Sequence, residues 1–469
     1  MTSSATESWR LDASALVEGY RQGAIDPMAT VDEALSRIAR IDPSLNAFVC
    51  LSPTARAEAE ASAERWRNGT PQGALDGVPV AVKDNLAVAG MPATFGSRLY
   101  ADTIAPQDEL PIRRLREAGA ILLGKTNTPE FAVEGYTSND LFGVTRNPWS
   151  PDLTPGGSSG GSVAAVAAGL VPVGIGTDGG GSTRRPAAYT GLVGFKPGNG
   201  HVPRADGLPQ VLLDFEVVGC FTRSIRDAAL LDSVLAGSDR ADPASRRRPT
   251  PETIRRPLRI LLVERIDANP CAPEILSAVR ASADSFTAMG HDVTQADLPF
   301  DCAGLAAVWS SIAEIGLARL LAVEPCFADK ANAKYVAMAE RGAARSASDL
   351  LEIMETVAAL RRRVSQAFAS FDLILMPSCA AMPWEATTAF PDRIDGQAVG
   401  PRGHAVYTGW VNAAGHPAIN LPCQVRPADL PIGFQLVGDL GAEALLLAVG
   451  AAYEERCPWD DRWPDIAAS

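Results

Sequence analysis

Lysine and histidine are scarce in this sequence. Of its 42 lysine and arginine residues only five are lysine, and the chain has four histidines. Arginine can fill almost any exposed cationic position, whereas only lysine can lose its proton inside a protein. A lysine in apolar surroundings is therefore a candidate general base. The five lysines are Lys83, Lys125, Lys196, Lys330 and Lys334.

The sequence also lacks an extended basic run. With 55 acidic against 42 basic residues, its formal net charge is −13. Affinity for phosphate groups comes from clustered lysine and arginine. Here three consecutive arginines occur only at 246–248 and 361–363. We therefore expect neither nucleic acid nor an anionic membrane as a partner.

Neither an export signal nor a membrane segment is indicated. The first residues, MTSSATESWRLDA, have no basic segment followed by an apolar stretch, which is the pattern of a signal peptide. Residues 153–177 are uncharged and long enough to span a bilayer. They contain Pro155, Pro172 and the run GGSSGGS, which are poorly suited to a spanning helix. We expect a cytoplasmic protein.

The eight cysteines include no C-x-x-C pair, which argues against a structural zinc site and against a disulfide framework. A reducing compartment is therefore expected. With 46% hydrophobic and 21% charged residues the chain has the composition of a globular protein with a large core. It is long enough for one large α/β domain or for two smaller ones.

Strand and helix patterns alternate along the chain, which predicts a mixed or mostly parallel sheet covered by helices. Thr30-x-x-Glu33 reads as a capping box at the start of a helix. Residues 238–257 are rich in charge and proline and indicate an exposed connector. This connector could divide two domains, but the later strands read as further members of the same sheet, so a single domain is preferred. The predicted strands are 78–82, 121–123, 171–175, 258–263, 373–376, 418–421 and 432–437, and the predicted helices are 55–67, 109–118, 161–169, 224–236, 272–289, 303–322, 347–369 and 442–456.

Three stretches place polar residues at the end of an apolar run or in a glycine-dense turn. They are GVPVAVKDN at 77–85, TPGGSSGGS at 154–162 and GTDGGGSTR at 176–184. Turns at the edge of a sheet are where α/β proteins bind ligands. These stretches therefore carry the candidate chemistry.

In the third stretch, successive glycines allow several backbone N–H groups to face a ligand, as an oxyanion-binding site requires. Ser182 at the end of this turn is a candidate nucleophile. A flexible glycine/serine loop is the alternative interpretation, and the preceding apolar run and Asp178 weigh against it.

The second stretch contains G-x-S-x-G at 157–161, which would make Ser159 the nucleophile of an α/β-hydrolase elbow. That elbow requires a strand immediately before it. Residues 147–155 contain three prolines and cannot form a central strand. A phosphate-binding P-loop is also unsupported, because its Gly-Lys-Ser/Thr ending is missing.

A nucleophilic serine needs a base, and Lys83 is the candidate. It ends an apolar run whose neighbours would keep water away from its amine. Burial of this kind can lower the pKa of a lysine by several units. The alternative is an ion pair with Asp84 or Asp178. For each of the four histidines a surface or packing role is the better prediction.

Together the three stretches resemble the amidase signature family of serine hydrolases. The matching positions are Lys83, Ser158 and Ser182, where the separation from Ser182 selects Ser158 rather than Ser159. Further matches are GKTNTPEF at 124–131, GLVGFKP at 191–197, NAAGHPA at 412–418 and LPIGFQLVG at 430–438. The resemblance implies one α/β domain over residues 1–469 with a mixed, largely parallel sheet. Its signature core would span about 70–240 and a variable substrate-pocket portion about 240–400.

The resemblance also implies the chemistry, which is hydrolysis of a C–N bond without a metal or a cofactor. Ser182 would attack a small-molecule amide, and Ser158 would relay its proton to neutral Lys83. The peptide bond Gly157–Ser158 would be cis. The N–H groups of Gly179, Gly180, Gly181 and Ser182 would bind the oxyanion, and Asp178, Arg184 and Ser159 would have supporting roles.

The chain departs from the family pattern at Gly179, Arg185 and His201. The first two adjoin the predicted nucleophile and are positions at which substrate choice would be tuned. Three alternatives stay open: the glutaminase-type subunit of a tRNA-dependent amidotransferase, an esterase using Ser159, and an inactive scaffold. A homodimer is the expectation for a stand-alone member.

Overall fold

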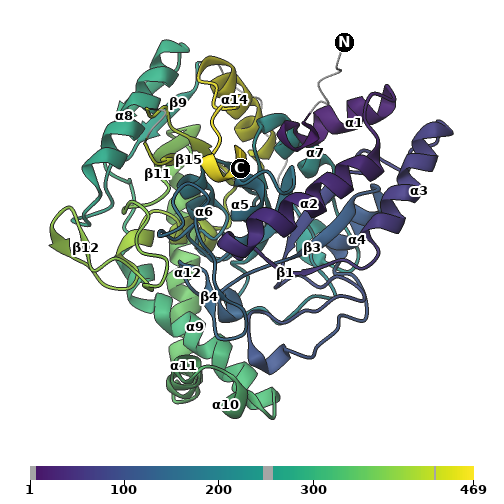
Figure 1. Cartoon of the computed structure of the whole chain (residues 1–469). Helices are drawn as coiled ribbons and strands as arrows, with labels where there is room; N and C mark the ends of the chain where they lie inside the picture. Colours follow the sequence, from purple (N-terminus) through teal and green to yellow (C-terminus); the bar gives the residue numbers. More distant parts are fainter. Residues whose placement is uncertain (1–6, 247–256, 427–428, 469) are drawn as a thin grey trace.

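One large mixed sheet runs through the molecule (Figure 1). The computed structural model describes residues 7–246, 257–426 and 429–468. In spatial order the sheet contains β1 (Phe48–Leu51), β3 (Ile121–Thr126), β2 (Pro79–Lys83), β6 (Val173–Asp178), β8 (Val217–Thr222), β7 (Val193–Lys196), β14 (Ala418–Pro422), β15 (Gly433–Gly438), β11 (Leu373–Pro377), β9 (Arg259–Leu262) and β10 (Asp292–Gln295).

Parallel pairing occurs in two blocks of this sheet. β2 pairs in parallel with β3 and β6, and β9 pairs in parallel with β10 and β11. The strands between these blocks, from β6 through β8, β7, β14 and β15 to β11, pair antiparallel. The predicted mixed α/β sheet is confirmed. Because strands from both sides of the 238–257 segment join it, the preference for a single domain is also confirmed.

Helices cover both faces of the sheet. Alternate residues of β2 show this, because Val80 and Val82 belong to one buried cluster whereas Ala81 packs into another. The first cluster includes apolar residues of α1 (Ala13–Arg21), α4 (Leu110–Glu117), α7 (Ile225–Leu235), α8 (Pro273–Ala288) and α14 (Glu443–Arg456). The second includes residues of α2 (Pro27–Leu45), α3 (Ala55–Arg67), α5 (Gly160–Ala167) and α6 (Arg184–Thr190).

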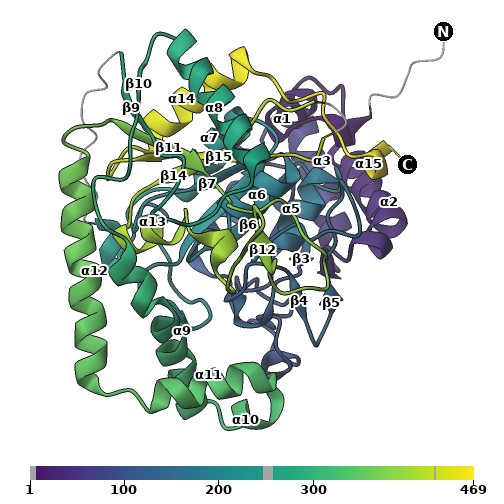
Figure 2. The same cartoon turned by 90° about the vertical axis from the view of Figure 1, so that its left-hand side faces the viewer.

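The other helices include the fully buried α13 and a group that begins with α9. Figure 2 shows the long α12 along one side, with α9, α10 and α11 near its lower end. Their bounds are α9 (Ala303–Val323), α10 (Phe327–Lys330), α11 (Ala333–Ala343), α12 (Ala347–Ala367), α13 (Gly409–Ala414) and α15 (Asp465–Ala468). Short 3-10 turns are η1 (Ser8–Arg10), η2 (Arg98–Tyr100), η3 (Glu130–Ala132), η4 (Pro243–Arg246) and η5 (Gly403–Ala405), and two small hairpins pair β4 (Ser138–Asn139) with β5 (Gly143–Val144) and β12 (Arg393–Ile394) with β13 (Gln397–Ala398).

Among the described residues, α9 is the one helix long and apolar enough to cross a membrane. Some of its side chains pack within the protein. Leu305 and Trp309 belong to the main core, and Leu317 and Leu320 pack in a second cluster with Phe131. In all, 39% of its most apolar stretch is buried inside the protein.

The predicted capping box at Thr30 is wrong. Helix α2 begins one turn earlier, at Pro27, and Asp26 caps it by accepting from the N–H groups of Met28 and Ala29. Proline at the first helical position and aspartate before it are both favourable for a helix start. Thr30 lies inside the helix and is buried.

The connector prediction is correct in part. Residues 238–246 are mostly exposed or half-buried, but Ser245 is buried because its hydroxyl accepts from the Asp239 N–H and donates to the Asp242 carbonyl. The rest of the predicted connector, 247–256, lies outside the described residues.

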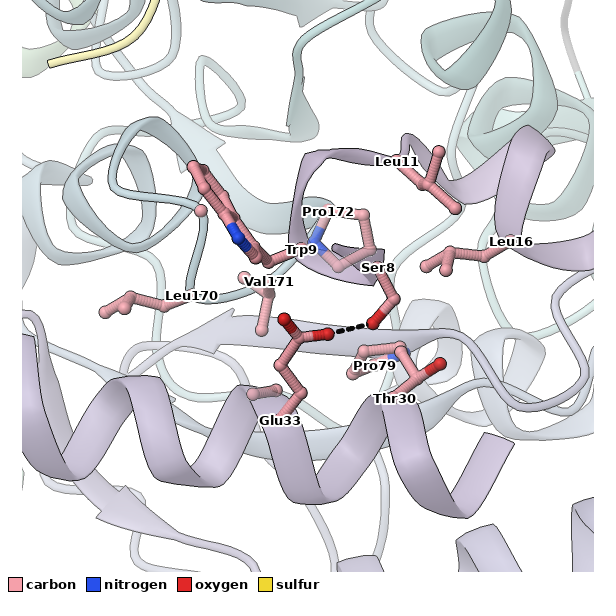
Figure 3. Close-up of a pocket in the computed structure, with 12 residues that line it drawn as sticks. Ser8, Trp9, Leu11, Leu16, Thr30, Glu33, Pro79, Leu170, Val171 and Pro172 are labelled. Carbon is pink, nitrogen blue, oxygen red and sulfur yellow. Dashed lines mark hydrogen bonds between the residues drawn. The ribbon is translucent and has the colours of Figure 1, made fainter. Parts of the chain in front are cut away.

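Residues 8–16 pack against the body of the protein and line a small pocket there (Figure 3). Trp9 and Leu11 line it together with Pro172, and the Ser8 hydroxyl donates to the Glu33 carboxylate on α2. This contact ties the turn η1 to the second helix of the chain.

Candidate active site

Lys83 and Asp178 are brought to one edge of the sheet by strand pairing. β2 ends at Lys83, β6 ends at Asp178, and the two strands run in parallel with Val82 opposite Ile175. The carboxyl ends of neighbouring parallel strands meet at the same edge. The polar residues that follow both strands therefore share one buried site.

The amine of Lys83 contacts two hydroxyl groups. Its Nζ lies 2.7 Å from Ser158 Oγ and 3.0 Å from Thr177 Oγ1. Asn85 Nδ2 donates to the same Thr177 oxygen over 2.8 Å. All four side chains are buried. The predicted pairing of Lys83 with Ser158 is thus present in the structure.

The alternative ion pairs of Lys83 are not formed. Asp84 accepts from Lys125 Nζ over 2.9 Å, and Asp178 pairs with Arg184 over 3.1 Å. Both carboxylates thus have other cations as partners. Lys83 is left with neutral hydroxyl partners, which suits a neutral amine.

Burial lowers the pKa of Lys83 to about 7, against an ordinary value of 10.5. Burial has the same effect on Lys196, which donates to the backbone carbonyl of Pro197. The pKa therefore does not distinguish these two lysines. The contact with a serine hydroxyl does, and it selects Lys83.

Ser158 and Ser159 differ in what their hydroxyl groups bind. The Gly157–Ser158 peptide bond is cis, as the resemblance implies. Ser159 stands at the N-terminal boundary of α5, and its Oγ donates to the Thr177 carbonyl over 3.3 Å. Residues 145–156 contain no strand of the sheet, so the strand required by a nucleophile elbow is missing from this described segment. Ser158, and not Ser159, is therefore the serine in contact with Lys83.

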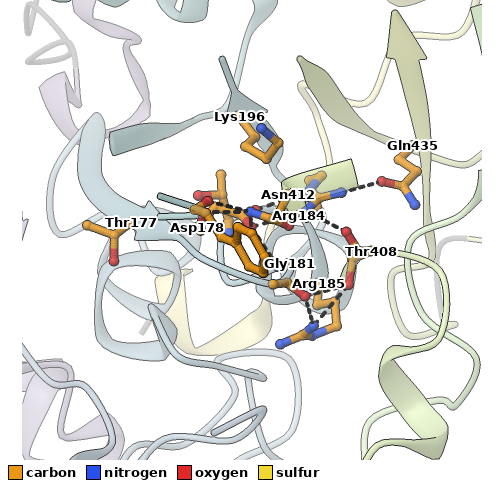
Figure 4. A network of polar contacts seen from close by, with 12 residues as sticks. Thr177, Asp178, Gly181, Arg184, Arg185, Lys196, Thr408, Asn412 and Gln435 are labelled. Atoms are coloured by element: carbon orange, nitrogen blue, oxygen red, sulfur yellow. Dashed lines mark hydrogen bonds and ion pairs between the residues drawn. The ribbon is translucent and has the colours of Figure 1, made fainter. Parts of the chain in front are cut away.

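Ser182 lies in the turn between β6 and α6, and 6% of its surface is exposed. Asp178 holds this turn by accepting from the N–H groups of Gly181 over 2.6 Å and Thr183 over 3.0 Å. Arg184 donates to both Asp178 oxygens over 3.1 Å (Figure 4). Burial by itself would raise the pKa of Asp178, but the Arg184 guanidinium holds that pKa well below its ordinary range.

Later parts of the chain complete the network around Arg184. Its guanidinium donates to Gln435 Oε1 on β15, to Asn412 Oδ1 on α13 and to the Thr408 carbonyl (Figure 4). Asn412 and Gln435 lie within sequence stretches that match the family, so the sequence could have indicated that they belong to the site. Thr177 adjoins Asp178 in the third stretch, whereas Thr408 has no sequence signal.

The Gly181 N–H cannot be the oxyanion donor that the sequence suggested, because Asp178 takes it as a hydrogen-bond partner. Among the described contacts, the N–H groups of Gly179, Gly180 and Ser182 have no acceptor. Gly181 has a φ of +117°, and a Cβ there would lie 2.2 Å from Thr408 Oγ1. Glycine is therefore required at 181 by conformation and space.

One predicted contact is not formed. In the described part of the chain, Ser182 Oγ makes no hydrogen bond, so it is not yet joined to Ser158. Catalytic hydrogen bonds are often long in a protein without substrate and tighten when substrate binds. Searching the described residues finds no group of three or more histidine, cysteine, aspartate or glutamate side chains placed to hold a metal ion.

Comparisons with known proteins identify the family of the chain. The family model described as Amidase matches residues 29–447. A glutamyl-tRNA(Gln) amidotransferase subunit from Synechococcus sp. (strain CC9605) is 34% identical, over 94% of this chain and 95% of that protein.

Solved structures show the same fold. A bacterial aryl acylamidase of the amidase signature family superimposes with a TM-score of 0.88 and 31% identity, over 98% of both chains. The 6-aminohexanoate cyclic dimer hydrolase superimposes with a TM-score of 0.87 and 30% identity, over 98% of this chain and 99% of that one. The chain belongs to the amidase signature family, whose members hydrolyse amides.

Proposed function

We propose that this protein hydrolyses a carboxylic amide of a small molecule to a carboxylate and ammonia or an amine, through an acyl-enzyme on Ser182. The observation that carries the proposal is the buried contact of 2.7 Å between Lys83 Nζ and Ser158 Oγ at the edge where Ser182 is presented. A buried lysine with a pKa near 7 and no acidic partner can serve as a general base.

In the proposed mechanism Ser182 Oγ attacks the amide carbon while its proton passes to Ser158, whose own proton passes to Lys83. The carbonyl oxygen becomes an oxyanion that accepts from the free N–H groups of Gly179, Gly180 and Ser182. The proton then returns through Ser158 to the leaving nitrogen, and the C–N bond breaks. Water hydrolyses the acyl ester by the same proton route, which releases the carboxylate and restores Ser182.

The glutaminase-type subunit of a tRNA-dependent amidotransferase is the second candidate, because curated relatives at 34% identity have names of that kind. We favour a stand-alone amidase, because the C-terminal sequence PWDDRW at 458–463 resembles that of stand-alone members of the family. A homodimer in the cytoplasm is part of the same proposal. The esterase alternative on Ser159 loses support, because that hydroxyl binds a backbone carbonyl.

The test is release of amine from a panel of primary amides, anilides and hydrazides by the purified chain, with Ser182→Ala as control. We expect turnover of at least one class by the unchanged protein and none by the variant. A fluorophosphonate probe should label Ser182, located by peptide mass analysis. Labelling at Ser159, or equal turnover by the variant, would contradict the proposal.

A further inference from the structure

One cation and two carboxylates lie together beside the nucleophile turn, the segment of residues 179–183 between β6 and α6. Arg204 Nε donates to Glu109 Oε1 over 2.7 Å, and its Nη1 donates to Glu216 Oε1 over 2.6 Å. The three side chains, called here the edge cluster, are at most 13% exposed. Burial would lower the pKa of Arg204, but the two carboxylates hold it above its ordinary value. The edge cluster thus holds one charged arginine between two carboxylates.

Glu216 stands at the same edge of the sheet as Lys83. It directly precedes β8, whose first residue, Val217, pairs with Asp178 at the end of β6. β6 pairs in turn with β2, which ends at Lys83. Neighbouring strands are about 4.8 Å apart, so β8 begins roughly 10 Å across the sheet from β2. A Cβ on Gly179 would lie 3.6 Å from the Cβ of Glu216, which places this carboxylate next to the nucleophile turn.

The other carboxylates close to Lys83 are matched one to one by cations. Asp84 pairs with Lys125 over 2.9 Å, and Asp178 pairs with Arg184 over 3.1 Å. The edge cluster differs from both pairs, because its two carboxylates share a single arginine. At this edge of the sheet, it is therefore the edge cluster that has one carboxylate more than it has cations.

The proposed mechanism creates a buried positive charge on Lys83 whenever its amine takes a proton. A buried charge is costly unless a counter-charge compensates it, and the amine itself contacts two neutral hydroxyl groups. Burial lowers the pKa of Lys83, and among the surrounding charges Glu216 opposes this effect most, followed by Asp178. Arg204 and Arg185 act in the opposite direction. Glu216 is thus the main counter-charge for the ammonium.

We propose that Glu216 is a positioning residue for the general base. Its carboxylate stabilises the ammonium form of Lys83 that arises when a proton passes from Ser158, and Arg204 holds that carboxylate in place. No contact with Lys83 is needed, because two unit charges about 10 Å apart inside a protein change a pKa by about one unit. This inference rests on the proposed amide hydrolysis and adds to it a residue from outside the three motif stretches.

The direct test is an NMR titration of the lysine side chains. Because the chain has only five lysines, labelling their ε-carbons with carbon-13 gives a simple spectrum, and the signal missing from Lys83→Arg belongs to Lys83. We expect the titration midpoint of Lys83 to fall by about one pH unit in Glu216→Gln, since the ammonium loses its counter-charge. Lys196 is an internal control and should keep its midpoint, because other charges, led by Arg184, act on it.

Two further variants separate charge from structure. Glu216→Asp keeps the carboxylate and should return most of the shift, whereas Glu352→Gln removes the same charge from an exposed position on α12 and should leave Lys83 unchanged. In Glu216→Gln, Arg204 still pairs with Glu109, so the buried arginine keeps a counter-charge. An unchanged Lys83 midpoint in Glu216→Gln overturns the inference.

Kinetics on a hydrolysed amide connect this charge to the reaction. In Glu216→Gln the rise of kcat/KM with pH should move by about one unit to lower pH, because Lys83 loses its proton more easily. The plateau of kcat should fall about 3- to 10-fold, because the amine is then a weaker base. A lower plateau with the rise in its original place would show a merely structural role and overturn the inference. Absence of turnover for every amide contradicts only the proposed hydrolysis, since the NMR titration requires none.

Discussion

At the scale of single residues, hydrogen-bond partners distinguish side chains that are otherwise alike. Lys83 and Lys196 are both buried with a lowered pKa, yet only Lys83 contacts a serine. Ser158 and Ser159 are neighbours, yet only Ser158 contacts the lysine. The proposed catalytic roles therefore rest on the contact between Lys83 and Ser158, because both lysines and both serines are buried.

Replacing Ser158 by alanine should lower kcat by about 100-fold or more, because the proton route from Ser182 to Lys83 is interrupted. Ser159→Ala is its matched control and should lower kcat less than about tenfold, since it removes one hydrogen bond to a backbone carbonyl. Steady-state kinetics of the two variants on one amide decides between them. A larger loss in Ser159→Ala would restore the esterase alternative.

The activity should depend on pH through Lys83. Below its pKa of about 7 the amine is protonated and cannot accept a proton, so kcat/KM should rise with pH below about 7 and level above it. Lys83→Arg keeps the positive charge but cannot be neutral, and should lose about 100- to 10 000-fold of kcat at all pH values. A pH profile of both proteins checks this. An active arginine variant, or a profile that falls as pH rises through 7, would rule out the neutral lysine.

At the scale of elements, the β6–turn–α6 unit presents Ser182, the proposed nucleophile. Asp178 closes the turn through two backbone N–H groups, and Arg184 fixes Asp178. The sequence indicated the strand, the turn and the helix, because apolar and glycine patterns are local. It misplaced the start of α2 at Thr30, since aspartate followed by proline also begins a helix, and it counted Gly181 as an oxyanion donor.

Gly181→Ala should disrupt this unit. The added methyl group meets Thr408 Oγ1, and φ of +117° is unfavourable for alanine, so we expect loss of activity and a lower free energy of unfolding. Gly69→Ala is the control, because Gly69 also has a positive φ of 68° but nothing within 4 Å. It should cost about 1–2 kcal/mol of stability and keep its activity. Urea unfolding and kcat for both variants test this, and equal activity losses would contradict it.

At the scale of the whole molecule, the site is assembled from both halves of the chain. Lys83, Ser158 and Ser182 come from the first half, whereas Thr408, Asn412 and Gln435 reach the nucleophile turn from the last 70 residues. The shared sheet makes this possible, because β14 pairs with β7 and β15 pairs with β14. Trp309, whose ring lies next to Gly180, comes from the part that the sequence suggested as the variable substrate-pocket portion.

The purified chain should hydrolyse small amides without a second protein. Both halves of the site belong to this one chain, so no partner is required to complete the Lys83–Ser158 contact. Light scattering should give twice the chain mass of 49.3 kDa, in keeping with the proposed homodimer. If activity appeared only with glutamine and a copurifying protein, the amidotransferase candidate would replace the stand-alone amidase.

The sequence by itself determined the alternating α/β plan and the family, and it singled out Lys83, Ser158 and Ser182 as the proposed catalytic residues, because these are carried by local apolar patterns and short motifs. The tertiary structure decided which groups are paired. It pairs Asp84 with Lys125 and the Gly181 N–H with Asp178, and it places the Arg185 guanidinium against the Gly180 carbonyl. Such pairings depend on distances between segments far apart in the chain, and only the packing of the sheet and its helices sets those distances.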